Sequence, residues 1–170
     1  MRTLTLLIFS IISISIHAQH METIEQVVSE LFVASDNRDW DKVEAIFADK
    51  VELDYSSMDG NPAVELSPQQ ITDAWKTILP GFTATHHQLG NFITRVNGET
   101  AEVFCYGTAS HYLEHEAGNI WTVVGSYNLQ VIKDGHTWRV AKMKLNFKYQ
   151  DGNTQLPQAA MDNVKKQNDE

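Results

Sequence analysis

The chain has 170 residues, of which 13 are basic and 22 acidic, so its formal net charge is −9. A phosphate backbone would repel such an acidic chain, which excludes nucleic acid as an expected partner. Its single cysteine, Cys105, cannot form an internal disulfide, and we expect a buried, unreactive thiol. A domain of this size buries a proper core without metal or disulfide, so its stability requires no cofactor.

Residues 1–18 have the features of a secretory signal peptide. Arg2 precedes an apolar run from Leu4 to Ile16, and the small residue Ala18 stands before Gln19. The run is shorter than the roughly 20 apolar residues needed to span a bilayer. We therefore predict cleavage after Ala18 and a secreted or periplasmic protein that has no membrane contact after cleavage. The alternative is an uncleaved anchor.

Two helices are predicted at the start of the mature chain. Between Ile24 and Ser35, apolar residues recur every three or four positions, as on the buried stripe of a helix. Asp36 lies on the flank of that stripe. The polar stretch 37–39 breaks the pattern, and Asp39 can cap a second, short helix that begins at Trp40.

A short strand and a third helix follow. Residues 51–55 alternate between apolar and polar side chains, which is typical of a strand. Ser67 and Gln70 can form a capping box around Pro68, so a helix is predicted to begin there and to end at Pro80-Gly81.

Residues 83–149 are rich in β-branched and aromatic side chains and contain three hairpin-turn signals, at 97–98, 117–119 and 134–135. They predict four long strands in an antiparallel, curved meander, with a bulge near Val140 where the apolar alternation slips. Helices followed by such a meander indicate an α+β fold. Because the composition turns polar after Gly152, we predict one domain over 19–152 and a polar tail over 153–170.

Small side chains on one predicted strand leave room for a cavity. Cys105, Gly107 and Ala109 share a face with His111, and a curved sheet with small residues under a helix is a common place for a small-molecule site. The alternative is that His111 only satisfies a buried carbonyl group.

Two other strands carry polar candidates. His87 shares its face with Ile93, whereas His86 points to the opposite side. Ser126 and Asn128 share a face that lies opposite an apolar row. An ordinary solvent-facing surface is the alternative for this second pair.

A metal site is a rival use of the histidines. His111 and His115 would lie about 13 Å apart in an extended strand, and the adjacent His86 and His87 diverge. His87 and His111 could still share an ion with Asp36. Because no ligand pair of the usual metal spacing accompanies them, we predict no metal.

The chain resembles the SnoaL-like branch of the nuclear-transport-factor-2-like superfamily, and within it the scytalone dehydratases. The resemblance covers most of residues 21–150 and rests on Asp36 with the Asn-Arg-Asp-Trp that follows it, Leu-Asp-Tyr55, the stretch Thr85-His86-His87-Gln88-Leu89-Gly90, and Trp138. It implies a cone-shaped, curved antiparallel sheet wrapped around N-terminal helices. The same fold hosts both enzymes and plain binders.

The resemblance also implies a set of site residues. The catalytic positions of the family fall on His87, Asp36, His111 and Tyr55, and its substrate-binding Ser-x-Asn pair falls on Ser126 and Asn128. The family tyrosine that precedes the aspartate is Ser35 here, so half of the tyrosine pair that polarises the substrate carbonyl is missing.

The resemblance implies a dehydratase-like hydro-lyase or isomerase-type enzyme that needs no cofactor. Its substrate would be a small hydroxy-carbonyl compound with a cyclic or aromatic frame. His87, held by Ser126, would remove and return a proton, Asp36 would fix the tautomer of His111, and Tyr55 would donate to the carbonyl. Asn128 would hold a substrate hydroxyl. The alternatives are a non-catalytic binder of a small apolar ligand in the same pocket and a dimeric interaction module, and a homo-oligomer stays open.

Overall fold

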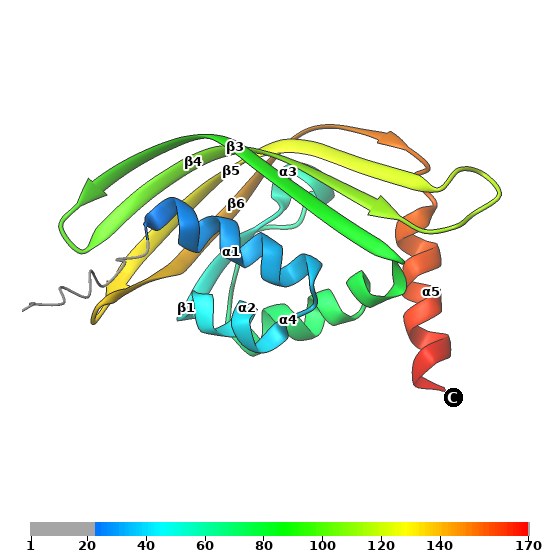
Figure 1. Cartoon of the computed structure of the whole chain (residues 1–170), viewed down its shortest axis with the longest axis horizontal. Helices are drawn as coiled ribbons and strands as arrows, with labels where there is room; N and C mark the ends of the chain where they lie inside the picture. The colour runs from blue at the N-terminus through cyan, green and yellow to red at the C-terminus, as the bar shows by residue number, and fades with distance from the viewer. Residues whose placement is uncertain (1–22, 170) are drawn as a thin grey trace, which may run out of the picture.

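A curved sheet arches over a layer of helices in the computed structural model, which describes residues 23–169 (Figure 1). The predicted signal peptide and its cleavage site fall on residues 1–22, outside the described part. In chain order the elements are α1 (Ile24–Asp36), α2 (Trp40–Ile46), β1 (Phe47–Asp54), α3 (Ser56–Asp59), β2 (Val64–Leu66), α4 (Pro68–Lys76), the 3-10 helix η1 (Leu79–Gly81), β3 (Ala84–Asn97), β4 (Thr100–Tyr112), β5 (Ile120–Asp134), β6 (Thr137–Gly152) and α5 (Leu156–Asn168).

The sheet has six strands in the order β2-β1-β6-β5-β4-β3. Strands β3 to β6 form the predicted antiparallel meander, and β1 adds to it by pairing parallel with β6 and antiparallel with β2. The predicted α+β fold with a curved sheet around N-terminal helices is confirmed. The sheet does not close, because β2 and β3 remain as its two edges.

Bulges produce part of the curvature. The pairing of β5 with β6 passes from Gln130↔Lys142 directly to Val131↔Val140, so Ala141 is an extra residue on β6. This confirms the bulge predicted near Val140. Because an extra residue on one strand bends that strand and increases the local twist, the bulge adds to the curvature of the sheet.

A bulge in β3 was not predicted. Its pairing with β4 shifts between Gly90 and Ile93, and Asn91 there has a left-handed φ of 55°. The shift reverses the alternation, so Ile93 is 52% exposed instead of facing inward with His87, as the alternation predicted. The upstream part of β3, which carries His87, keeps its predicted orientation.

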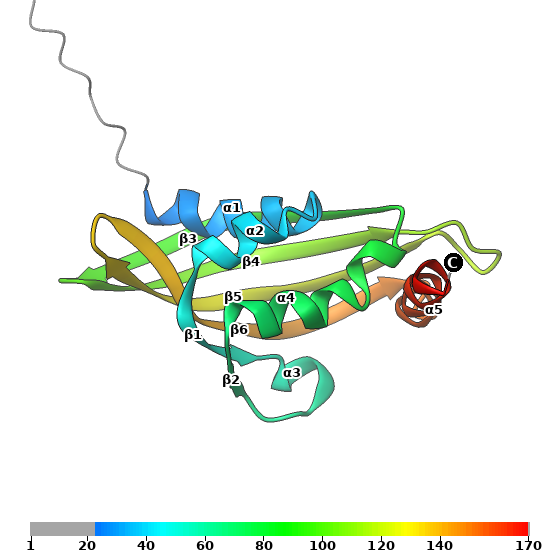
Figure 2. The same ribbon diagram turned by 90° about the horizontal axis from the view of Figure 1, so that it is seen from below.

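The helices α1, α2 and α4 cover the concave face of the sheet, as the view from below shows (Figure 2). Ser67 forms the predicted capping box on α4, and the predicted cap Asp39 accepts from the Lys42 N–H of α2. Thr23, which was not predicted as a cap, forms a second capping box on α1. Their apolar stripes meet the sheet in one core in which Val28, Leu31, Val43, Val51, Val131 and Val140 are fully buried. No helix among residues 23–169 is long and apolar enough to cross a membrane.

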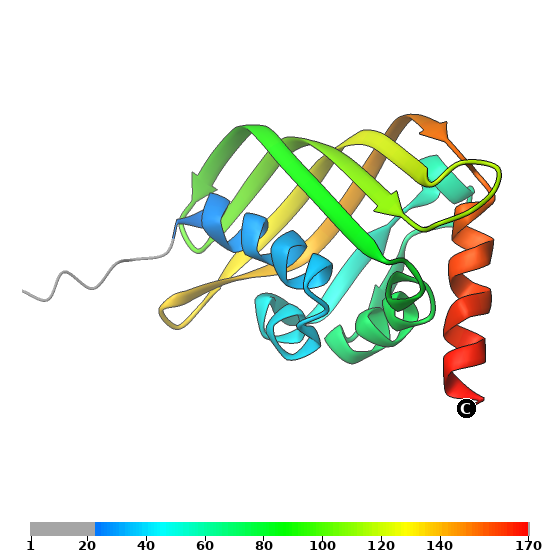
Figure 3. The same ribbon diagram turned by 45° about the vertical axis from the view of Figure 1, so that its right-hand side comes forward.

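The predicted polar tail is instead helix α5, which packs at one end of the sheet (Figure 3). Leu156 and Ala160 are fully buried, and a Cβ built on Gly81 would lie 1.9 Å from the Ala160 carbonyl oxygen. The buried stripe of α5 is narrow and consists of Leu156 and Ala160. Its sequence therefore looks polar, and its partner Gly81 comes from a distant part of the chain.

Candidate active site

A cavity of about 490 Å³ lies between the concave face of the sheet and the helices. Aliphatic and aromatic side chains form most of its wall, and a few polar groups interrupt them. The wall consists of Phe32, Ser35, Tyr55, Met58, Asp59, Trp75, Ile78, Leu79, Phe82, His87, Ala109, His111, Trp121, Val123, Tyr127 and Leu145. A volume of this order holds a one- or two-ring molecule.

The wall carries little charge. Among the described residues that line it there is no lysine or arginine, and its one carboxylate, Asp59, is exposed. Moving an unpaired anion into such a site is costly because no cation compensates for its lost hydration. The cavity therefore favours neutral, apolar ligands.

The end of α1 brings Asp36 against His87 of β3. Asp36 Oδ1 lies 2.7 Å from His87 Nδ1, and its Oδ2 accepts the His87 backbone N–H at 2.7 Å. The Thr85 hydroxyl donates to Asp36 Oδ1 at 2.8 Å. Because an ionised carboxylate only accepts hydrogen bonds, Nδ1 must carry the proton. Neutral His87 therefore has an unprotonated Nε2, and its ring lines the cavity.

Asp36 stays ionised despite its position. Only 15% of its side chain and 13% of that of His87 are exposed. Burial, the largest single influence, opposes ionisation of Asp36. The hydrogen bonds and charge of His87, together with the Thr85 hydroxyl, outweigh it and lower the pKa of the carboxyl. A buried carboxylate that orients an imidazole from behind is the arrangement of a general base.

His111 is the second imidazole of the cavity, and its ring centroid lies 6.0 Å from that of His87. Its Nδ1 lies 3.3 Å from the Trp121 carbonyl oxygen and must donate to it, so its Nε2 is also unprotonated. Burial, assisted by the nearby His87, lowers the pKa of His111 to about 4. Asp36 therefore orients His87, and the predicted pairing of Asp36 with His111 is wrong. The alternative, in which His111 satisfies a buried carbonyl group, is correct for its Nδ1, which donates to Trp121.

Two phenols, one partly buried and one buried, complete the polar wall. Tyr55, at the end of β1, accepts a hydrogen bond from the Trp75 side chain, and burial strongly raises its pKa. Tyr127, on β5, is 7% exposed, and burial followed by the proximity of Tyr55 raises its pKa as well. Sequence reasoning placed Tyr127 in the apolar row of its strand and missed it as a site residue. Its position on the inward face, paired with Cys105 of the small-residue strand, is the signal that could have identified it.

The family model of the SnoaL-like domain matches residues 17–144. The chain belongs to the SnoaL-like domain family. Its fold is the one predicted from the resemblance to the nuclear-transport-factor-2-like superfamily. A search of functionally curated proteins found no match.

Solved structures similar to this SnoaL-like chain agree with the fold. A Kribbella flavida protein has 22% identity and a TM-score of 0.73 over 79% of this chain and 93% of its own. A Novosphingobium aromaticivorans protein provisionally named scytalone dehydratase has 19% identity and a TM-score of 0.65, over 78% and 87%. A hexachlorocyclohexane dehydrochlorinase from Novosphingobium barchaimii has 14% identity and a TM-score of 0.64, over 77% and 88%.

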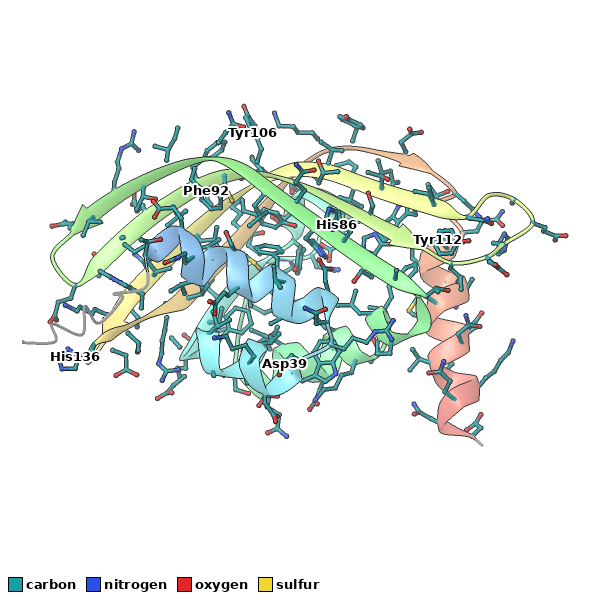
Figure 4. All side chains as sticks on the ribbon, viewed as in Figure 1. Asp39, His86, Phe92, Tyr106, Tyr112 and His136 are labelled. Carbon is teal, nitrogen blue, oxygen red and sulfur yellow. The ribbon has the colours of Figure 1, made fainter. Side chains whose placement is uncertain are left out.

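Two predicted substrate-binding residues of the SnoaL-like domain do not reach the cavity. Ser126 pairs with Tyr106 and Asn146 across the sheet, on the convex side where Tyr106 is exposed (Figure 4). Asn128 lies on the same side and accepts from Asn146 Nδ2 at 2.7 Å. Because side chains alternate along a strand, the residue between them, Tyr127, faces inward. The solvent-facing alternative is therefore correct for Asn128, which is exposed, whereas Ser126 is buried on the convex side of the sheet. Neither side chain reaches the cavity, and Ser126 does not hold His87.

Ser35 also lines this SnoaL-like cavity. Ser35 stands where the resemblance to the scytalone dehydratases implies a tyrosine, and its hydroxyl donates to the Leu31 carbonyl at 2.8 Å. Between residues 23 and 169, no group of three or more His, Cys, Asp or Glu side chains is placed to hold a metal ion.

Cys105 is fully buried, and burial raises its pKa to about 12. The thiol is thus an unreactive part of the core.

Proposed function

We propose that this protein is an acid–base lyase that eliminates water from a small, neutral β-hydroxy ketone with a cyclic or aromatic frame. The observation that carries the proposal is the Asp36–His87 pair, whose unprotonated Nε2 belongs to a ring in the wall of an apolar cavity. A passive binder has little use for a buried carboxylate aligned behind an imidazole. The names of the dehydratase and dehydrochlorinase neighbours support an elimination reaction.

The elimination would proceed in two stages. His87 Nε2 takes the proton from the carbon beside the carbonyl, and the electron pair of that C–H bond moves onto the carbonyl oxygen as an enolate. The enolate then re-forms the carbonyl while the neighbouring C–O bond breaks and a carbon–carbon double bond forms. The imidazolium of His87 returns its proton to the departing hydroxyl, which leaves as water. Asp36 stabilises the imidazolium between these stages.

The remaining wall groups define the substrate class. His111 is neutral above about pH 4 and presents an acceptor nitrogen, which suits a substrate hydroxyl. The aromatic wall suits a flat ring, and the lack of lysine and arginine among the described lining residues disfavours carboxylates and phosphates. A neutral hydroxy ketone of one or two rings satisfies all three conditions.

Hydrogen–deuterium exchange at the carbon beside a carbonyl tests the base without a leaving group. Purified protein in heavy water should speed the exchange of β-tetralone, a neutral two-ring ketone, measured by NMR. It should also dehydrate the aldol adduct of benzaldehyde and acetone to benzylideneacetone, measured by absorbance. His87→Ala should slow both by about 10²- to 10⁴-fold, the usual contribution of a positioned base.

His86→Ala is the matched control, because His86 is the neighbouring residue but lies exposed on the other side of β3. It should change both rates by less than about threefold. If wild-type protein binds β-tetralone and accelerates neither reaction, the cavity belongs to a binder. Equal losses from the two histidines would contradict the assignment of His87 as the base.

A further inference from the structure

Tyr127 is a buried residue whose hydroxyl has an unused donor. The residue is 7% exposed and lines the cavity, and within residues 23–169 its hydroxyl makes no hydrogen bond. A buried tyrosine hydroxyl normally has a hydrogen-bond partner, since desolvation without one is costly. Its open position at the cavity wall therefore points to a partner supplied by the ligand.

The strand that faces Tyr127 is shaped to hold its ring. A Cβ built on Gly107 would lie 2.4 Å from Tyr127 Cε2, so only glycine leaves the ring room to cross β4. The ring also packs against Phe32 with a centroid separation of 4.8 Å. These contacts fix the orientation of the phenol before any ligand arrives, which lowers the entropic cost of binding.

The other side-chain donors of the cavity wall are occupied. The proton on His87 Nδ1 is given to Asp36, and that on His111 Nδ1 to the Trp121 carbonyl oxygen. Ser35 donates to the Leu31 carbonyl oxygen. The two indole N–H groups are likewise used, by Gln150 in the case of Trp121 and by Tyr55 in the case of Trp75.

Two donors remain, the hydroxyls of Tyr55 and Tyr127. Because the Tyr55 oxygen already accepts from Trp75, its proton is free to point at a ligand. The two unprotonated imidazole nitrogens can only accept, so neither competes for a carbonyl oxygen. We propose that Tyr127 and Tyr55 together form the binding site for the substrate carbonyl, an inference that rests on the proposed elimination. Tyr127 thereby supplies the second phenol that is absent at Ser35.

The two phenols suit the enolate stage of that reaction. Burial raises the pKa of both hydroxyls, so each keeps its proton at neutral pH. A hydrogen bond from a fixed donor strengthens as negative charge develops on the carbonyl oxygen, which lowers the barrier to enolate formation. Tyr127 is therefore assigned as a catalytic residue that contacts the reacting oxygen.

Binding of two matched ligands tests this site separately from turnover. β-Tetralone carries a carbonyl, and tetralin has the same frame without it. Calorimetry or competition should show that Tyr127→Phe weakens β-tetralone binding about tenfold and leaves tetralin binding unchanged, since one hydrogen bond is lost. Tyr106→Phe is the control, because Tyr106 lies on the convex face and is 46% exposed (Figure 4). It should alter neither affinity.

The infrared carbonyl band of bound β-tetralone gives a readout in the wild-type protein that needs no variant. Donation by the phenols should move the band to lower frequency, and Tyr127→Phe should reverse part of that shift. Equal losses of β-tetralone and tetralin affinity, or an unshifted band, would overturn the inference and leave the His87 experiment standing. A Tyr127-dependent affinity without any hydrogen exchange would retain the carbonyl site and refute the proposed elimination.

Discussion

Each imidazole of the cavity is held in one tautomer by a single acceptor behind it. For His87 the acceptor is a carboxylate, and for His111 it is the backbone carbonyl of Trp121. The two acceptors have different consequences, because a carboxylate stabilises an imidazolium whereas a carbonyl in a buried, apolar setting does little to offset desolvation. The same side chain is therefore prepared as a base at one position and, with a pKa lowered to about 4 by burial, as a neutral acceptor at the other.

Asp36→Asn tests the contribution of the carboxylate charge. The amide keeps an oxygen that can accept a hydrogen bond, but it cannot stabilise an imidazolium, so we expect exchange and dehydration rates to fall by about 10²- to 10⁴-fold. The free energy of unfolding should fall by no more than about 2 kcal/mol. Thr85→Val removes one hydrogen bond from the same carboxylate and leaves its charge, and it should retain most activity. Unchanged rates with a steep loss of melting temperature would make Asp36 structural.

The pKa of His111 predicts how stability depends on pH. In the folded protein burial lowers the pKa from 6.5 to about 4. Between these values the unfolded chain binds a proton at His111 that the folded chain does not, so acidification through this range favours unfolding. Between pH 7 and pH 5 the loss should amount to about 2 kcal/mol, measured by urea unfolding.

The lowered pKa of Asp36 acts in the same direction only at more acidic pH, below the usual carboxyl value of 3.8. His111→Gln keeps a donor for the Trp121 carbonyl and cannot titrate. This variant should therefore show a flatter dependence of stability between pH 7 and pH 5. An unchanged slope in His111→Gln would mean that other groups cause the acid sensitivity.

At the scale of elements, α5 supports the end of the cavity that carries His111. Its buried residues Leu156 and Ala160 share a core with Phe82 and Trp121. The Phe82 ring centroid lies 4.9 Å from that of His111, and the Trp121 ring centroid lies 4.5 Å from it. The helix touches the cavity wall from behind, and the segment matched by the SnoaL-like family model, residues 17–144, stops before it.

Ala160→Glu should detach this helix. A carboxylate at a fully buried position beside Gly81 has no partner there, so we expect a loss of about 2 kcal/mol or more in the free energy of unfolding. Hydrogen exchange of the α5 amides should accelerate before that of the sheet. Gln158→Glu adds the same charge to an exposed position of α5 and should have little effect. If the two variants behave alike, α5 does not depend on this contact.

At the scale of the whole molecule, the open sheet and the helix layer enclose the cavity between them. The sheet contributes His87, His111 and Tyr127 from three adjacent strands, while the helix side and the end of β1 contribute Trp75 and Tyr55. No single element contains two of the three polar wall groups of the sheet. The site therefore forms only when the helices pack against the sheet. Ligand binding at the site thus reports on whether the whole domain is folded.

The local features of this architecture could be predicted from the sequence. Capping residues such as Ser67, hairpin signals and the slip near Val140 depend on neighbouring residues alone, and all have their expected counterparts in the structure. Strand alternation and helix position singled out His87, His111 and Asp36, and the resemblance to a family added Tyr55 and the catalytic roles. Three of these, Tyr55, His87 and His111, line one cavity, with Asp36 directly behind His87.

The errors concern pairings between distant segments. The position of α5 depends on its contact with Gly81, and the partner of Asp36 depends on the angle at which α1 crosses β3. Neither contact produces a periodic pattern in the sequence. Asn91 has a left-handed backbone that a β-rich stretch conceals, so Ile93 was assigned to the wrong face. Ser126 and Asn128 lie on the convex side of β5, and Tyr127 between them has the inward position because side chains alternate along a strand.

The hydrogen bond from the His87 backbone to Asp36 has a consequence for solubility. Strand β3 is a free edge of the sheet, and the unpaired N–H groups of such an edge invite strands from other molecules. The His87 backbone N–H donates a hydrogen bond to Asp36 Oδ2, so the end of α1 lies against the strand at that point. The carboxylate that orients the imidazole thus also removes one free backbone donor from the edge of the sheet.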